Sequence, residues 1–171
     1  WLTYGKSQAG LRMGSRDAAP AAAESPLSYL ANKRIEQNLN YISLAPGDET
    51  LERWLGEVIY ARESKPASLS YSFNLENPYP GEAILTIQLL GFLRHPIDPD
   101  HHVKIYLHNP LGSFYLGEAW WDGLSWQTVE LSIEPGLLVA GENTILVECP
   151  NDTGLGVDVL YLDWLNLEVP T

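Results

Sequence analysis

The strongest constraint on the fold is a series of short apolar segments that alternate with turn-forming residues through the last two thirds of the chain. In residues 68–75, apolar side chains fall on every second position, which is the pattern of a strand with one buried face. Residues 83–90 are apolar at nearly every position, as expected for a central strand covered on both faces. Further strands are predicted at residues 103–107, 113–121, 127–133, 143–149 and 157–169.

Turn chemistry separates these segments. Gly, Pro, Asn and Asp favour tight turns, and such residues gather at 77–81, 108–112, 122–123, 134–136 and 151–154. The absence of amphipathic helical patterns between the segments argues against a parallel α/β sheet. The sequence therefore predicts an all-β fold, namely a jelly-roll-like sandwich of two antiparallel sheets.

The first 60 residues are less regular, because their apolar spacing also fits helices. We expect strands at 34–42 and 54–60 and an exposed Ala- and Pro-rich loop at 18–26. A chain of 171 residues with 45% hydrophobic content can build one sizeable core. A single domain over residues 1–171 is predicted. Since the sequence begins at Trp1 without a signal peptide, we expect a piece of a larger protein.

The net charge of the chain limits the classes of partner that it can bind. The chain has 22 acidic and 10 basic residues, for a formal net charge of -12. Such a surface repels polyanions, so nucleic acid and anionic membranes are excluded as expected partners. No apolar run approaches the roughly 20 residues that a membrane helix needs. Cys149 is the single cysteine, so no internal disulfide can form.

Residues 137–147 resemble the turn-then-strand signature of jelly-roll sandwiches in the galactose-binding-like class. Leu137 and Leu138 would close one end of the sandwich. Gly141 would adopt a positive φ, and Asn143 would fix the turn before the next strand. A galactose-binding-domain-like sandwich is the fold that this resemblance implies.

Residues 159–168, together with 10–13 and 121–123, resemble the β-rich region that precedes the catalytic domain in gingipain-type bacterial cysteine peptidases. This resemblance covers most of the chain. It implies an extracellular or cell-surface parent in which the region is accessory or propeptide-like, docking against or covering a neighbouring domain. The catalytic residues of that family lie in the following domain and match no position here, so we expect no enzyme activity.

No catalytic constellation emerges from the residues themselves. A thiol nucleophile would have to be Cys149 with one of three histidines, but its place in an alternating strand favours a small apolar core residue. His102 and His108 would lie about 20 Å apart on one strand, too far to share an ion. We expect the adjacent His101 and His102 to occupy a solvated loop. Asp163 is interpreted as a partner of a turn backbone rather than one of a catalytic carboxylate pair.

Carbohydrate binding is the alternative function, because sugars stack on exposed aromatic rings beside polar groups. One of Trp120 and Trp121 must face inward, and we assign Trp54 and Trp164 to the core. The candidate ligand-binding residues are Trp121, Trp126, Asp122, His102, Asn109 and Tyr115.

A structural calcium ion is a second hypothesis, because calcium takes hard oxygen ligands from loops. Its candidate ligands are Asp98, Asp100, Asp152 and Asp158. Ordinary Asp-rich turns are the alternative interpretation of the same residues. No other cofactor is predicted.

Overall fold

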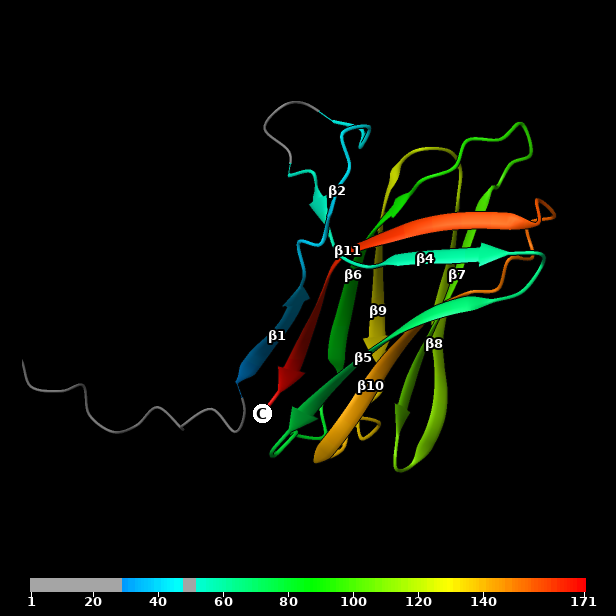
Figure 1. Ribbon diagram of the computed structural model, residues 1–171. Helices are drawn as coiled ribbons and strands as arrows, with labels where there is room; N and C mark the ends of the chain where they lie inside the picture. The colour runs from blue at the N-terminus through cyan, green and yellow to red at the C-terminus, as the bar shows by residue number, and fades with distance from the viewer. Residues whose placement is uncertain (1–28, 48–51) are drawn as a thin grey trace, which may run out of the picture.

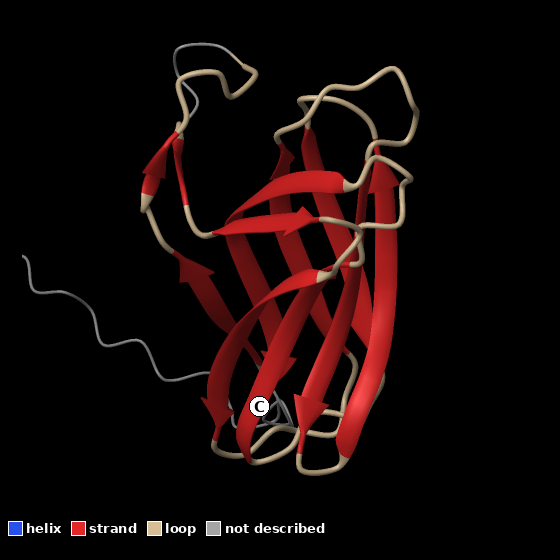
Figure 2. Cartoon of the chain, turned by 45° about the vertical axis from the view of Figure 1, so that its right-hand side comes forward, coloured by secondary structure: helices blue, strands red, loops and turns tan. Residues whose placement is uncertain are grey.

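The computed structural model describes residues 29–47 and 52–171, and the described chain consists of strands and connecting segments without helices (Figures 1 and 2). The strands are β1 Leu30–Glu36, β2 Asn40–Tyr41, β3 Trp54–Leu55, β4 Val58–Arg62, β5 Ala67–Leu75, β6 Ala83–Gly91, β7 His101–Asn109, β8 Gly112–Trp121, β9 Trp126–Ile133, β10 Gly141–Cys149 and β11 Val157–Pro170. No described helix could span a membrane. The predicted loop at 18–26 and the motif at 10–13 lie outside the described residues.

Two antiparallel sheets pack face to face. One has the strand order β1-β11-β6-β9, with β4 also paired to β11, and the other has the order β5-β10-β7-β8. Strands β2 and β3 form a separate two-stranded ribbon, which Figure 2 shows projecting beside the sandwich. The predicted jelly-roll-like β-sandwich, of the kind found in galactose-binding-like domains, is confirmed.

Alternation along the strands builds the core. Leu85, Ile87 and Leu89 point inward from β6, and Ile105 and Leu107 meet them from β7 of the opposite sheet. Each of these side chains is fully buried, and burying one such side chain contributes about 1.5–3 kcal/mol. The period-two pattern predicted the inward face of strands such as β7.

The prediction that β6 is covered on both faces is wrong for most of the strand, because Ile84 is exposed and Thr86 and Gln88 are only partly buried.

The N-terminal strands differ from the prediction. The expected strand at 34–42 is divided into β1 and β2, and the one at 54–60 is divided at Gly56 into β3 and β4. Gly56 N donates to Leu162 O at 2.8 Å, and an added Cβ at Gly56 would lie 2.9 Å from that same oxygen. The chain thus bends tightly against β11 at a glycine, and the short ribbon separates from the main sheet.

β11 is the long strand of the larger sheet, and it is irregular in the middle. Its first part, Val157 to Tyr161, pairs with β4, and its last part pairs with β1. Its register against β6 shifts between Leu162 and Trp164. Asp163 is the extra residue of this β-bulge, a feature that bends a strand and redirects side chains. The bend is visible in Figure 1.

β7 begins earlier than predicted. It starts at His101, and both His101 and His102 are buried and paired with β8 opposite Trp121 and Trp120. The expected solvated loop is therefore wrong at these two positions. Burial of the two imidazole rings is possible because each is hydrogen-bonded to a carboxylate, His101 to Asp158 and His102 to Asp152.

The closed end of the sandwich follows the prediction. Leu137 and Leu138 pack against the core, and Gly141 has a φ of 93°. The buried Asn143 side chain accepts from Val139 N at 3.1 Å and donates to Val139 O at 2.8 Å. Asn143 thus bridges the turn that leads into β10.

Candidate functional site

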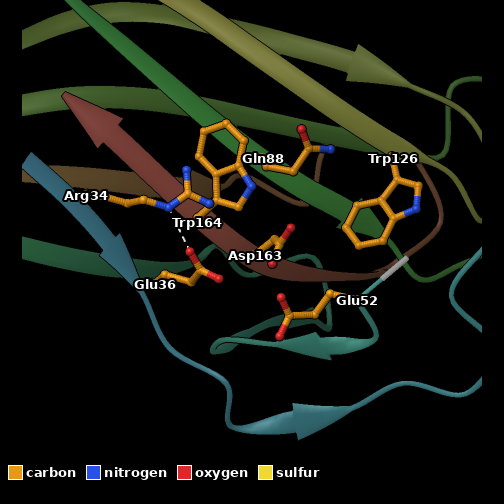
Figure 3. A pocket seen from close by; sticks show the side chains of 7 residues that line it. All are labelled: Arg34, Glu36, Glu52, Gln88, Trp126, Asp163 and Trp164. Atoms are coloured by element: carbon orange, nitrogen blue, oxygen red, sulfur yellow. Dashed lines mark hydrogen bonds and ion pairs between the residues drawn. The ribbon is translucent and has the colours of Figure 1, made fainter. Parts of the chain in front are cut away.

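A cleft of about 370 Å³ lies on the face of the larger sheet that points away from the sandwich core (Figure 3). Its wall residues come from β1, β6, β9 and β11 and from the segment just before β3. Each of their side chains carries either a polar or charged group or an indole ring. The lining residues are Arg34, Glu36, Glu52, Gln88, Trp126, Asp163 and Trp164.

The first half of the cleft is organised around Trp164. The guanidinium carbon of Arg34 lies 4.3 Å from the centroid of the Trp164 ring. Arg34 Nε donates to Glu36 Oε2 at 2.7 Å. A cation above an indole face is attracted by the ring electrons, so this half already contains a guanidinium held by one ring and one carboxylate.

The second half is organised around Trp126. Its Nε1 donates to Pro46 O at 2.8 Å, which ties the ring to the loop between β2 and β3. Arg53 holds that loop, because its Nη1 donates to the carbonyl oxygens of Ser43 and Ala45, both at 2.7 Å. The segment after β2 therefore holds the Trp126 ring in place, and Glu52, just before β3, lines the cleft beside it.

Three carboxylates give the cleft a negative potential. Burial, together with the nearby charges of Glu36 and Glu52, raises the pKa of Asp163 to about 6, whereas Arg34 acts in the opposite direction. The bulge in β11 is what brings the Asp163 carboxyl to this surface beside Glu52, as Figure 3 shows. Such a site repels anionic ligands and favours neutral or cationic groups.

Only Trp126, among the six candidate ligand-binding residues, lines this cleft. Trp121 is only 8% exposed and packs 5.0 Å from the His101 ring, so it does not offer an open ring face. His102 is 1% exposed and stacks on Trp120 with ring centroids 3.4 Å apart. Sequence reasoning assigned an outward role to both, but pairing of β7 with β8 places them inside.

The other three candidates lie apart from the cleft. Asn109 donates to Leu137 O at 2.7 Å and stabilises the closed end of the sandwich. Tyr115 is an exposed residue of β8, in edge contact with Tyr106. Asp122 is exposed in the turn after β8, where slight desolvation and the charge of Asp100 raise its pKa. The six residues therefore do not form one site.

The four candidate calcium ligands mostly serve as hydrogen-bond acceptors. Asp100 accepts from Gly123 N at 2.8 Å, Asp152 lies 2.7 Å from His102 Nδ1, and Asp158 lies 2.6 Å from His101 Nδ1. Asp98 is exposed at the surface. Within residues 29–47 and 52–171, no group of three or more His, Cys, Asp and Glu side chains is arranged to hold a metal ion.

Cys149 occupies the core, as the sequence suggested. It is fully buried, and its Sγ donates to Asp158 Oδ2 at 3.3 Å. Burial, with the Asp158 charge, raises the pKa of this thiol well above its usual range. A peptidase nucleophile needs the opposite shift, so the geometry gives no thiol chemistry at Cys149.

Two tryptophans and one aspartate differ from their predicted roles. Trp54 is 46% exposed and meets Tyr41 edge to face at 5.4 Å between centroids, so its assignment to the core is wrong. Trp164 is half-buried on the outer face, beneath Arg34. Asp163 stands in the bulge of β11 rather than at a turn.

Most cleft residues were missed because they come from five separate segments. One clue was present, namely a charged residue between Leu162 and Trp164 in an otherwise core-like strand. A charge at an inward position of such a strand can mark a bulge. Nothing in the sequence indicated that Arg34, Glu52 and Gln88 would meet there.

Neither a protein-family model nor a curated protein matches the sequence, but several solved structures match the fold. Dimeric latent PorU from Porphyromonas gingivalis aligns with a TM-score of 0.62, at 13% identity over 84% of this chain. The present chain spans only 13% of the length of that PorU chain. A family 29 carbohydrate-binding module complexed with mannohexaose aligns with a TM-score of 0.51, at 13% identity, over 82% of this chain and 92% of the module.

A carbohydrate-binding module of family 36, in complex with calcium and xylotriose, aligns with a TM-score of 0.42 at 15% identity, over 80% of this chain and 97% of the module. The likeness to PorU and to the family 29 module shows that this β-sandwich fold occurs both within a long chain and as a small binding module.

Proposed function

We propose that this chain is a non-catalytic accessory domain of a larger secreted or cell-surface protein, and that it docks against a neighbouring domain through the β2–β3 ribbon and β4. The carrying observation is a concentration of exposed apolar side chains. Of the fourteen large hydrophobic residues exposed in the described chain, six lie between positions 39 and 60. They are Leu39, Tyr41, Leu44, Trp54, Val58 and Tyr60.

This apolar docking surface, as we call these six residues, has no evident role within the sandwich. The ribbon forms its own two-stranded sheet, and the Tyr41–Trp54 pair at its base faces solvent. Large apolar side chains that gather at the surface are typical of sites that bind another protein. In an accessory domain, that surface would be covered by the next domain of the same polypeptide.

The fold comparison supports the same proposal. In PorU, a sandwich of this kind occupies a small part of a much longer chain. Because the identity is 13%, this likeness concerns the fold. More specifically, we propose that the domain lies beside the catalytic domain of a gingipain-like peptidase, in a propeptide-like or covering role.

Hydrogen exchange would test the docking role. We would compare the isolated 171-residue chain with the complete polypeptide from which it comes, with Tyr41→Ser and Trp54→Ser combined as the disrupting variant. Amides of residues 52–62 should exchange more slowly in the complete polypeptide, and the double variant should remove that protection. Tyr115→Ser, an exposed aromatic change on β8, is the matched control. Equal exchange of 52–62 in the two proteins would contradict docking through this surface.

Carbohydrate binding is a second candidate, favoured by the pairing of Trp126 and Trp164 with polar groups in the cleft. A glycan-array screen with and without calcium would test it, using Trp164→Ala as the disrupting variant and Trp120→Ala as a control outside the cleft. Binding that is lost only in Trp164→Ala would support this function. If glycan binding depended on calcium, that result would also support the hypothesis that this domain holds a structural calcium ion.

A further inference from the structure

We propose that the cleft receives a basic side chain, an arginine or a lysine, from the domain against which the apolar docking surface packs. This inference rests on the proposed docking function and names the chemistry of the partner. The Trp126 half of the cleft, formed by Trp126, Asp163 and Glu52, is the receiving site.

The cleft already holds one basic side chain of the chain itself, that of Arg34, in the way that we propose for the ligand. In the Trp164 half, the Arg34 guanidinium lies over an indole ring and is paired with the Glu36 carboxylate. The Trp126 half offers the same components, a tryptophan ring with carboxylates beside it (Figure 3). Among the described residues, neither Asp163 nor Glu52 has a side-chain hydrogen bond or ion pair. Within the part of the chain that the structure describes, a cation therefore stacks on Trp164 and none stacks on Trp126, although the Arg34 charge also reaches Asp163 and acts to lower its pKa.

Charge favours a cation over a sugar or an acid in this half. After burial, the charges of Glu36 and Glu52 are the causes that raise the pKa of Asp163, so a negative charge on Asp163 is repelled by both neighbouring carboxylates. A neutral sugar would leave that repulsion in place, and a uronic acid would increase it. A guanidinium or ammonium group would relieve it, and a guanidinium can also stack on an indole while pairing with a carboxylate.

Size and position agree with this ligand. A volume of about 370 Å³ is near the lower end of the range of roughly 300–1,000 Å³ for small-molecule sites, which suits one side chain better than an oligosaccharide. The site is also continuous with the docking surface, because Glu52 lies two residues before Trp54 and Trp126 is bonded to the ribbon loop at Pro46. A partner domain that covers the ribbon would therefore lie beside the cleft.

Binding of a short peptide can test the receiving site without the partner domain. The probe is acetyl-Gly-Arg-Gly-amide, titrated into the 171-residue chain while the indole N–H resonances of the tryptophans are followed by NMR. Its control is the same peptide with citrulline, which keeps the shape of arginine but has no charge. We expect the arginine peptide to shift the Trp126 resonance in a saturable way and the citrulline peptide to leave it unchanged. Equal shifts from both peptides would overturn the inference.

Variants locate the site and separate it from the docking function. Asp163→Asn with Glu52→Gln should weaken binding of the arginine peptide at least about tenfold, as expected for loss of charged hydrogen bonds. Glu134→Gln with Glu142→Gln, an exposed pair elsewhere, should not. If the arginine peptide fails to bind although the hydrogen-exchange test supports docking, this inference is wrong and docking stands. If the peptide binds at Trp126 but the ribbon is not protected, the receiving site stands and the proposed docking fails.

Discussion

The Nδ1 atom of His101 and the Oδ1 atom of Asp158 are 2.6 Å apart, and both side chains are fully buried. Asp158 belongs to β11 of the larger sheet, whereas His101 belongs to β7 of the smaller one. Asp158 Oδ2 also accepts from His102 N and from the Cys149 thiol, both at 3.3 Å. The Asp158 carboxylate therefore links the two sheets where β7 and β11 begin.

Replacing Asp158 should strongly destabilise the fold. Asp158→Ala leaves a buried imidazole and a buried backbone N–H without their acceptor, and breaking a buried pair in this way typically costs about 3–5 kcal/mol. The free energy of unfolding, from urea denaturation, measures the effect. Asp152→Ala is the control, since it removes a single hydrogen bond, to the His102 ring, from a side chain that is itself 44% exposed, and it should cost only about 1–2 kcal/mol. Equal losses in the two variants would contradict the bridging role of Asp158.

The buried thiol should be unreactive in the folded protein. Cys149 has no exposed surface and its pKa is raised by burial and by Asp158, so little thiolate is available and reagents cannot reach it. A colorimetric disulfide reagent at pH 8 should label Cys149 only as fast as the protein unfolds, and urea should release one fast equivalent. Fast labelling without urea would contradict the core position of Cys149.

Two glycines of the sandwich, Gly91 and Gly117, should differ in how they tolerate a methyl group. An added Cβ at Gly91 would collide with the His101 ring and lie 2.6 Å from Trp121 Nε1. Because both rings are buried and cannot move away, Gly91→Ala should cost about 1–3 kcal/mol in urea denaturation. At Gly117 the added atom would meet only the end of the flexible Leu131 side chain, and the loss should be below about 1 kcal/mol. A larger loss at Gly117 would contradict this account.

The ribbon should be able to loosen while the sandwich stays folded. Arg53→Gln removes the hydrogen bonds from Arg53 to the carbonyl oxygens of Ser43 and Ala45, and bonds to charged groups contribute about 1.5–3 kcal/mol each. Amide exchange at residues 42–47 should therefore quicken, whereas exchange in β6 and β7 should not change. Arg62→Gln, on β4, serves as the control. Faster exchange throughout the sandwich would mean that the ribbon and the core unfold together.

Sequence reasoning recovered the sandwich but not the site. Strands such as β5 and β10 were predicted closely because the alternation of apolar residues is a local record of burial. His101 and His102 were misplaced because polar side chains indicate exposure unless distant carboxylates satisfy them. The cleft depends on register between β1, β6 and β11 and on a one-residue bulge, and neither can be read from a single segment.

The bulge residue Asp163 should make stability depend on pH. Its pKa is raised from an ordinary value of 3.8 to about 6 in the folded protein, so the folded state holds its proton over a pH range in which the unfolded state has released it. Stability from this group is therefore greatest below pH 4 and falls as the pH rises to about 6. The carboxylate is half exposed, and screening by solvent reduces the expected loss to about 1 kcal/mol.

Asp163→Asn removes this titration and tests it directly. At pH 7 the variant should be more stable than the original chain by about 1 kcal/mol, because Asn carries no charge that burial penalises or that Glu36 and Glu52 can repel. At pH 4 the two proteins should unfold at nearly the same urea concentration. Since the same substitution should weaken binding of the arginine peptide, Asp163 would then be a residue that lowers stability while serving a binding site. Equal stability of the two proteins at pH 7 would show that the pKa of Asp163 is not raised by its burial and its neighbours in the cleft.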